Sequence, residues 1–447
     1  MENFGIRIGR RVNLRFIPLV MTGLVVAAVL VWVLGGYFGY DIHALISYFS
    51  DEPPRYVVNI AVGDRVFGVH TFGDYLLAHD YATSGSPWIN SISASNNYPP
   101  LAMGFFWVLS LLPYKIGLAL FLLLSILSML YPVVAELRRQ NAFEKYGVLL
   151  VPCILSVGVI AALDRGNYVA LLVTPLYLFF RMIKEEKWER SVLLLALMVS
   201  LKIYPLLLLV AYLPKLKFLR MAQVVLYSLV ASVASALFFH GGLIKNLKAI
   251  YHGILGYHAI GPAGLDPGNT SLFGAVSRTL VKFPSLIKEF QFVTSHQWWL
   301  GIAYFLLVLY TLLSKKVPQE IVVFLLVSVL WQVPPLSFHY VTCFLLVPIA
   351  LSLRDVRVTP HEGERGSYRL LYTLTTISIL ATLLPIVIPI VHGSENAMRS
   401  IASFSWAVLA IAASLLSGWN LNFKKWDIHT VKRVRKWTIE KINAIAG

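Results

Sequence analysis

Residues 191–213 read SVLLLALMVSLKIYPLLLLVAYL, an apolar run with Lys202 and Pro205 near its middle. Basic residues border the run on both sides: Lys184, Lys187 and Arg190 before it, and Lys215, Lys217 and Arg220 after it. Because Lys and Arg gather on the cytoplasmic side of a membrane, we expect both ends of the run there. The run therefore predicts two short helices that meet at a break, which membranes tolerate where the broken helix lines a protein or aqueous cavity.

The whole chain has the composition of a membrane protein. Of its 447 residues, 57% are hydrophobic and 13% are charged, and the mean hydropathy is +0.71. Soluble domains are about 45–50% apolar and about 25% charged. The composition thus excludes soluble globular, disordered, collagen-like, coiled-coil and disulfide-scaffold proteins. Cys153 and Cys343 lie inside apolar runs, which indicates small packing residues, so they carry no information about the redox compartment.

Apolar runs divide the chain into membrane spans. The first, residues 16–38, follows four arginines and is too long for a signal peptide. Residues 99–112 are apolar but short, so we expect an interfacial or half-membrane helix there. Further spans are predicted at 115–137, 147–163, 168–183, 221–239, 298–314, 321–333, 338–353, 370–391 and 402–420. The fold class predicted is an all-α polytopic membrane protein with roughly 10–13 membrane helices.

The predicted topology places the protein in the plasma (inner) membrane with both termini cytoplasmic. Residues 1–420 form one transmembrane domain, with external loops at 40–98 and 241–297. Most of the net charge of +16 falls on the predicted cytoplasmic segments. Residues 421–447 form a basic tail, expected to lie as a helix on the anionic inner leaflet, with nucleic-acid binding as the weaker alternative. Most histidines fall on the external face, so chemistry is expected there.

The first external loop carries two candidate carboxylates, Asp74 and Asp80. Their spacing of six residues puts them on different faces of a helix, so they are not an obvious catalytic pair. Since Asp74 follows Gly73, the alternative to a catalytic role is a helix cap.

Polar residues within or next to apolar runs give further candidates. Residues 163–168, Leu-Asp-Arg-Gly-Asn-Tyr, form a short external turn that faces water or a ligand, or else a tight turn capped by Asn167. Lys202 is costly inside a membrane and therefore indicates function, with snorkelling to the surface as the alternative. His339 lies at the mouth of a predicted helix, where it would donate to a phosphate, accept a proton or serve only as an interfacial histidine.

Other segments are informative in what they contain or lack. Residues 245–258 predict an amphipathic interfacial helix, and residues 264–272 read as a turn followed by an Asn/Thr/Ser helix start. The chain has no zinc-protease motif, calcium loop, P-loop or serine-hydrolase elbow. We therefore predict no metal site and no cofactor, although the sequence does not itself exclude a divalent metal.

Six short elements, taken in order, resemble those of glycosyltransferase family 87: Asp74, Tyr98–Leu101, Arg165–Asn167, Leu201–Pro205, Asn269–Leu272 and Ser337–His339. The family consists of polytopic GT-C enzymes, among them alpha-mannosyltransferases of phosphatidylinositol mannoside and lipoglycan assembly. The resemblance implies a GT-C fold and a polyprenyl-phosphate sugar donor, typically of mannose, used on the external face. Two positions depart from the family: Thr270 stands where Gln is common, and Phe338 where Trp is found.

The resemblance also implies roles for the candidates. Asp74 would be the general base, with Asp80 in reserve and His339 in support. Donor phosphate and substrate would be bound by Tyr98, Arg165, Asn167, Lys202, Tyr204, Asn269 and Ser271. The acceptor would be a glycolipid or lipid-linked glycan, and a single displacement would invert the anomeric configuration.

Other functions fit parts of the pattern. A transporter or lipid flippase would explain Lys202 and the broken helix, but it predicts matching halves and a polar path, whereas the polar residues cluster on one face. A non-catalytic scaffold would leave the external polar residues without a role. Among enzymes, the nearest alternatives are a glycan ligase and a transferase of arabinofuranose or glucose.

Overall fold

The computed structural model describes residues 72–88, 98–141, 147, 150, 156–259, 269–314, 316–353, 365–383 and 394–417. The predicted first span at 16–38 and the basic tail at 421–447 lie outside these residues, as does most of the first external loop.

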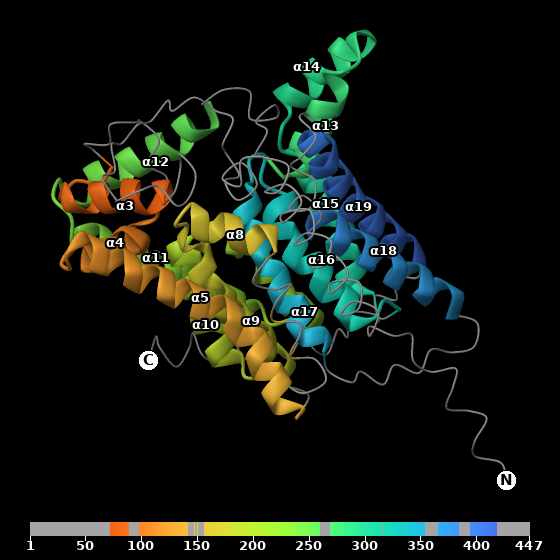
Figure 1. Ribbon diagram of the computed structural model, residues 1–447, viewed down its shortest axis with the longest axis horizontal. Helices are drawn as coiled ribbons and strands as arrows, with labels where there is room; N and C mark the ends of the chain where they lie inside the picture. The colour runs from red at the N-terminus through yellow and green to blue at the C-terminus, as the bar shows by residue number, and fades with distance from the viewer. Residues whose placement is uncertain are drawn as a thin grey trace, which may run out of the picture.

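Helices account for nearly all of the described chain (Figure 1). In order they are α3 (Gly73–Thr83), α4 (Pro100–Ser110), α5 (Tyr114–Arg139), α8 (Val157–Asp164), η2 (Tyr168–Leu172), α9 (Val173–Lys184), α10 (Trp188–Leu201), η3 (Tyr204–Lys215), α11 (Phe218–Leu237), α12 (Leu243–Ala259), α13 (Leu272–Leu280), η5 (Pro284–Leu286), α14 (Ile287–Ser295), α15 (Trp299–Leu313), α16 (Gln319–Gln332), η6 (His339–Leu345), α17 (Leu346–Ser352), α18 (Arg365–Leu383) and α19 (Ser394–Ser417). The prediction of an all-α membrane protein is confirmed.

Long and short apolar helices are mixed in this fold. Within the described residues, three helices are long and apolar enough to cross a membrane: α5, α11 and residues 400–417 of α19. A fourth span results if α14 and α15, which meet at a bend of 71°, count as one. The shorter apolar helices include α4, η3 and α16. At 11 residues, α4 is about 16 Å long, about half of the hydrocarbon thickness, as expected for a half-membrane helix.

The predicted break in residues 191–213 is confirmed. Helix α10 ends at Leu201, Lys202 is extended with φ −149° and ψ 134°, and η3 begins at Tyr204. Pro205 occupies the first turn of η3, where its missing N–H costs no helix bond. The break therefore arises from local sequence.

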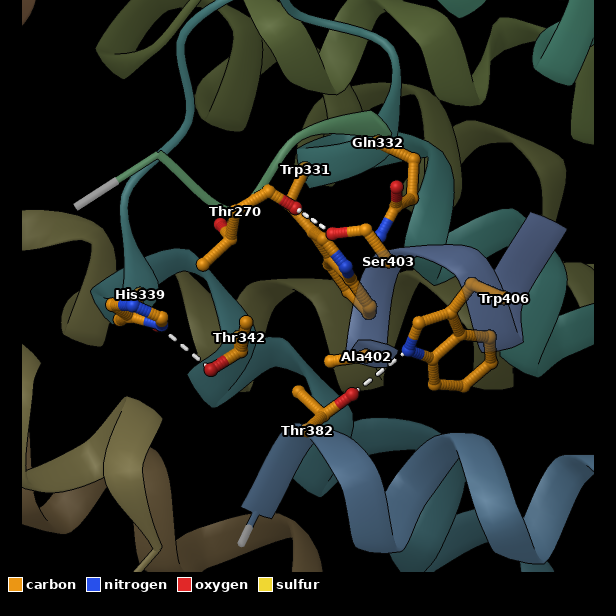
Figure 2. Close-up of a pocket in the computed structure, with 9 residues that line it drawn as sticks. All are labelled: Thr270, Trp331, Gln332, His339, Thr342, Thr382, Ala402, Ser403 and Trp406. Carbon is orange, nitrogen blue, oxygen red and sulfur yellow. Dashed lines mark hydrogen bonds between the residues drawn. The ribbon is translucent and has the colours of Figure 1, made fainter. Parts of the chain in front are cut away.

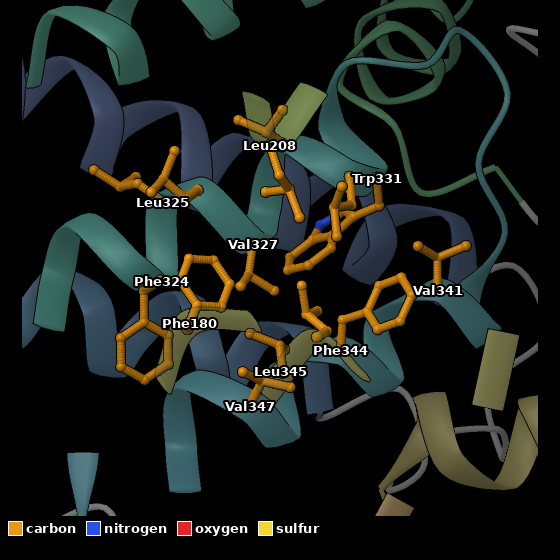
Figure 3. Close-up of a cluster of buried hydrophobic side chains, with 14 of the residues drawn as sticks. Phe180, Leu208, Phe324, Leu325, Val327, Trp331, Val341, Phe344, Leu345 and Val347 are labelled. Atoms are coloured by element: carbon orange, nitrogen blue, oxygen red, sulfur yellow. The ribbon is translucent and has the colours of Figure 1, made fainter. Parts of the chain in front are cut away.

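Two hydrophobic clusters form the core. The larger one joins α9, α16, η6, α17 and α19, and part of it is shown in Figure 3 around Phe324, Trp331 and Phe344. The smaller one joins α3, α4 and α5 around Tyr75 and Phe106. Leu201, directly before the break, packs against both clusters. The break thus lies where the two clusters meet.

Candidate active site

Asp74 lies in the first turn of α3, and its side chain is 14% exposed. It does not cap the helix, because Phe72 occupies the N-cap position and no side chain makes a cap bond there. Instead, the Asp74 backbone N–H donates to the carbonyl of Arg165 at 2.9 Å. The start of α3 is thus fixed to the turn that follows α8.

The turn after α8 supplies two hydrogen bonds to the Asp74 carboxylate. Arg165 Nη2 donates to Oδ1 at 2.9 Å, and Asn167 Nδ2 donates to Oδ2 at 2.7 Å. Asn167 Oδ1 also accepts from the Val169 N–H at 3.0 Å and so caps η2. Asn167 therefore caps a helix, as one of its two predicted roles required, and its contact with a ligand stays a prediction. A carboxylate has about four lone-pair sites, so Asp74 can still accept a bond from a substrate hydroxyl.

Gly166 explains why this turn can approach α3 so closely. Its φ is +62°, and a Cβ atom there would lie 2.8 Å from Cβ of Tyr75 and 3.3 Å from Cα of Phe72. A larger residue would crowd α3, so the turn or the helix would have to shift. The Arg-Gly-Asn order thus follows from the geometry of the site.

The guanidinium of Arg165 carries a fixed positive charge. Burial lowers its pKa, but the opposing influence of Asp74, with smaller ones from Tyr340 and Tyr98, leaves the pKa of Arg165 raised overall. Arg165 is therefore protonated at every working pH.

Lys202, at the break between α10 and η3, lies close to the same carboxylate, with which it interacts electrostatically. Its Nζ lies 5.2 Å from the ring centroids of both Tyr98 and Tyr168. The Tyr168 hydroxyl donates to the Leu201 carbonyl at 2.7 Å, which fixes the ring against the break. Ring faces attract an ammonium group but accept none of its hydrogen bonds in the usual geometry. Lys202 can therefore offer its N–H donors to an anion.

We call Asp74, Arg165, Asn167 and Lys202 the charged cluster. With two cations and one carboxylate it carries a net charge of +1, which suits an anionic ligand.

A second polar region, the Asn269 turn, consists of residues 269–272 and 334–339. Asn269 is fully buried and forms an isolated β-bridge with Phe338. Its Nδ2 donates to the Pro335 carbonyl at 2.7 Å. Its Oδ1 accepts from the backbone N–H groups of Ser271 at 2.9 Å and Ser337 at 3.1 Å. The contacts observed for Asn269 therefore hold two loops together.

Ser271 confirms the predicted helix start. Its Oγ accepts from the Gly274 N–H at 3.0 Å, which caps α13, and donates to the Pro335 carbonyl at 3.0 Å. These bonds position the segment that leads to His339. Direct contact of Asn269 or Ser271 with substrate stays a prediction.

His339 is the first residue of η6 and is 4% exposed. The Thr342 hydroxyl donates to its carbonyl at 2.7 Å. As Figure 2 shows, the imidazole lies at one end of a small pocket lined by Thr270, Trp331, Gln332, Thr342, Thr382, Ala402, Ser403 and Trp406. Its surroundings combine two indoles with amide and hydroxyl groups.

Helix α8 and η6 touch through their backbones. A Cβ atom on Gly158 would lie 2.4 Å from the Cys343 backbone nitrogen and 2.6 Å from Thr342 Oγ1. Arg165 directly follows α8 and His339 begins η6. The charged cluster and the Asn269 turn are therefore linked by one close helix contact.

Two predicted site residues lie apart from these contacts. Asp80 is 62% exposed on α3, where it lies 3.5 Å from His79 Nδ1, and its role as reserve base stays a prediction. Tyr204 begins η3, with its ring centroid 6.3 Å from that of Phe344. Its hydroxyl is buried and has no hydrogen-bond partner among the described residues. Contact of that hydroxyl with substrate stays a prediction.

The model of glycosyltransferase family 87 matches residues 96–333, which is more than half of the chain. The chain belongs to glycosyltransferase family 87. Comparison with curated proteins finds no match. This family 87 protein is a membrane glycosyltransferase, and the family implies a lipid-linked sugar donor and an acceptor in the membrane. The matched region holds the turn after α8, Lys202 and Asn269.

Sequence reasoning missed some residues that build the site of this family 87 enzyme. Tyr168 forms one wall of the Lys202 site; the sequence placed it in the candidate turn but gave no sign of this contact. Tyr340 acts electrostatically on Arg165. Gly158 gave no signal, since a glycine in an apolar helix does not reveal its neighbour.

Within the described ranges, no group of three or more His, Cys, Asp or Glu side chains could hold a metal ion. The absence of a metal requirement stays a prediction for this family 87 enzyme.

Proposed function

We propose that this protein transfers a sugar from a polyprenyl-phosphate donor to a glycolipid or lipid-linked glycan acceptor, and that the sugar is mannose. The observation that carries the proposal is the charged cluster. It combines a carboxylate held by Arg165 and Asn167 with Lys202, a cation held between two rings. A base beside fixed cations is what sugar transfer from a phosphate requires.

In the proposed reaction, the oxygen of an acceptor hydroxyl attacks the anomeric carbon of the donor sugar. The bond from that carbon to the phosphate oxygen breaks, and its electron pair leaves with the polyprenyl phosphate. Asp74 accepts the proton of the attacking hydroxyl. Because the attack and the departure are on opposite sides of the carbon, the anomeric configuration is inverted.

The cations have a separate task in this reaction. Negative charge grows on the leaving phosphate, and a preorganised cation stabilises it without reorganising. Lys202 has N–H groups available, while Arg165 uses Nη2 for Asp74. We assign Lys202 as the principal phosphate ligand and Arg165 as the residue that both orients Asp74 and adds charge.

His339 and the Asn269 turn complete the proposed site. Asn269 and Ser271 fix the loop before η6 through backbone contacts, and the loop fixes His339. His339, Tyr98 and Tyr204 then contact the sugar or the phosphate.

The membrane position of the site fits a lipid donor. The basic residues flanking residues 191–213 lie at the far ends of α10 and η3 from Lys202. By the distribution of basic residues, those ends are cytoplasmic and the charged cluster is external. The donor tail stays in the bilayer while its phosphate reaches Lys202.

A transfer assay tests the proposal. Purified protein in lipid nanodiscs is given radiolabelled polyprenyl-phosphate mannose and a membrane lipid extract as the source of acceptor. We expect Asp74→Asn to lower transfer by about 10²–10⁴-fold, the usual contribution of a general base. Asp80→Asn, a matched change on the same helix, is expected to retain wild-type transfer, and EDTA is expected to leave the rate unchanged.

Each outcome tests a different part of the proposal: the base, the sugar or the class of donor. Full activity of Asp74→Asn would remove Asp74 as base. Transfer from another polyprenyl-phosphate sugar, but not from the mannose donor, would replace mannose. If no polyprenyl-phosphate sugar yields a glycosylated lipid, the proposed donor class is wrong.

A further inference from the structure

Three side chains near the bend between α14 and α15 form an exposed aromatic strip, Phe292–His296–Trp299. The ring centroids of Phe292 and His296 are 4.6 Å apart and stacked, and those of His296 and Trp299 are 6.4 Å apart. Phe292 is 64% exposed and Trp299 is 67% exposed. Three adjacent rings in water would leave a contiguous apolar surface uncovered, which indicates a partner.

The aromatic strip continues an apolar stripe on α15. Trp299, Ile302, Leu306 and Leu313 follow helical spacing, and each of the last three is at least 42% exposed. The buried residues of α15, which include Tyr304 and Val308, lie on its other face. Helix α15 lies within the predicted span 298–314 and is the apolar arm of a bent pair that, together with α14, qualifies as one candidate span. An outward stripe on this arm would face lipid, so the aromatic strip adjoins a lipid-facing surface.

The bend directs α14 along the membrane. Helices α14 and α15 meet at 71°, so if α15 crosses the bilayer, α14 runs nearly parallel to its surface. Figure 1 shows α14 projecting beyond α13 at one end of the bundle. No residue of α14 is buried, and two lysines are exposed there: Lys282, which precedes the helix, and Lys288, in its first turn.

We propose that the aromatic strip lies in the headgroup region of the bilayer and that α14 rests on the membrane as an interfacial helix. Aromatic rings with a polar atom gather at that depth, where an apolar body meets lipid and a polar edge meets water. Lys282 and Lys288 are placed to contact lipid phosphates. Lipid, rather than a protein, is the partner because the strip is continuous with the lipid-facing stripe of α15.

Spin labels measure the depth of the strip directly. The full-length protein, with Cys153 and Cys343 replaced by alanine, receives one new cysteine at a time and is reconstituted in vesicles of phosphatidylcholine and phosphatidylglycerol. Phe292→Cys probes the strip, and Gln291→Cys is its matched neighbour, exposed but on a different side of α14. Leu306→Cys gives the lipid reference.

We expect the Phe292 label to be relaxed by oxygen, as the Leu306 label is, at a depth of about 5–10 Å in the headgroup and acyl boundary. The Gln291 label is expected to be relaxed by a water-soluble nickel chelate. The proposal is overturned if the chelate reaches the Phe292 label as readily as the Gln291 label. It is also overturned if neither reagent reaches Phe292, because a protein surface would then cover the strip.

Discussion

The charged cluster and the Asn269 turn both gather polar residues at the ends of short helices, yet they are bonded differently. In the cluster, side chains bond to side chains: Asp74 reaches Arg165 and Asn167, which lie 91 and 93 residues away in the chain. In the turn, the side chain of Asn269 bonds to backbone groups of Ser271, Pro335 and Ser337. The structure of the charged cluster is therefore held by bonds to a charged carboxylate, whereas the Asn269 turn is held by neutral hydrogen bonds to the backbone.

Among the variants proposed, removing one charge from the charged cluster should have the largest effect on stability and on transfer. In Arg165→Met, the Asp74 carboxylate loses its cation in a site where it is only 14% exposed. Breaking such a pair costs about 3–5 kcal/mol, so we expect a large fall in thermal stability in nanodiscs and almost no transfer. Adding Asp74→Asn to Arg165→Met should restore much of the stability but no activity. A double variant as unstable as Arg165→Met would show that the two residues are not coupled.

The Asn269 turn should lose stability when the side-chain amide that bonds to the backbone is removed, although no charge is lost. Asn269→Ala leaves the buried backbone N–H groups of Ser271 and Ser337 without their partner, whereas the Pro335 carbonyl keeps its bond from Ser271 Oγ. Each unsatisfied group costs about 1–3 kcal/mol, so we expect a total of about 2–6 kcal/mol in unfolding free energy and slower transfer.

Thr270→Val is the control for that variant, since the Thr270 hydroxyl makes one bond, to the Ser337 carbonyl, while its backbone keeps another. It should cost less than half as much as Asn269→Ala. Equal costs would mean that Asn269 does not organise the turn.

The contact between α8 and η6, which links the two regions, can be strained without replacing a residue of either region. Gly158→Ala places a Cβ atom against Thr342 and Cys343, and overpacking of this kind costs about 1–3 kcal/mol. We expect reduced transfer with donor binding largely kept, because α8 and η6 must separate. Gly104→Ala on α4 meets no atom within 4 Å and should leave stability equal or higher. If both variants behave alike, the α8–η6 contact does not set the geometry of the site.

The smallest effect is expected at Asp80, on the same helix as Asp74. Its side chain is 62% exposed, and its contact with His79 is 3.5 Å long. Exposed pairs contribute about 0–1 kcal/mol, so the melting temperature of Asp80→Asn should match that of the wild type. A marked loss would show that the charged cluster extends along α3.

Local signals predicted much of the fold. The break at Lys202 followed from basic residues on both sides and a proline, and the start of α13 followed from Ser271, which caps it as predicted. The short helix at 100–110 followed from the length of its apolar run. These features depend on residues within a few turns of each other.

Contacts between distant segments escaped prediction. Asp74 and Arg165 were both candidates, but nothing in the sequence placed them 2.9 Å apart. The pairing of Asn269 with Pro335 was hidden for the same reason, since loops of different segments meet only through packing. Nor does an apolar run distinguish an α-helix from a 3-10 helix, so the form of η2, η3 and η6 was not predicted.

The 3-10 form of η3 changes how far a short segment reaches. Its 12 residues, at about 2.0 Å per residue, extend about 24 Å, whereas an α-helix of that length would extend about 18 Å. That is most of a hydrocarbon layer of about 30 Å. On the topology proposed above, Lys215, at the far end of η3, and Lys202, just before its start, would therefore lie near opposite surfaces of the membrane. In that arrangement, a segment shorter than an ordinary span of about 20 residues would bring the ammonium group of Lys202 to the water boundary, where lipid phosphates lie.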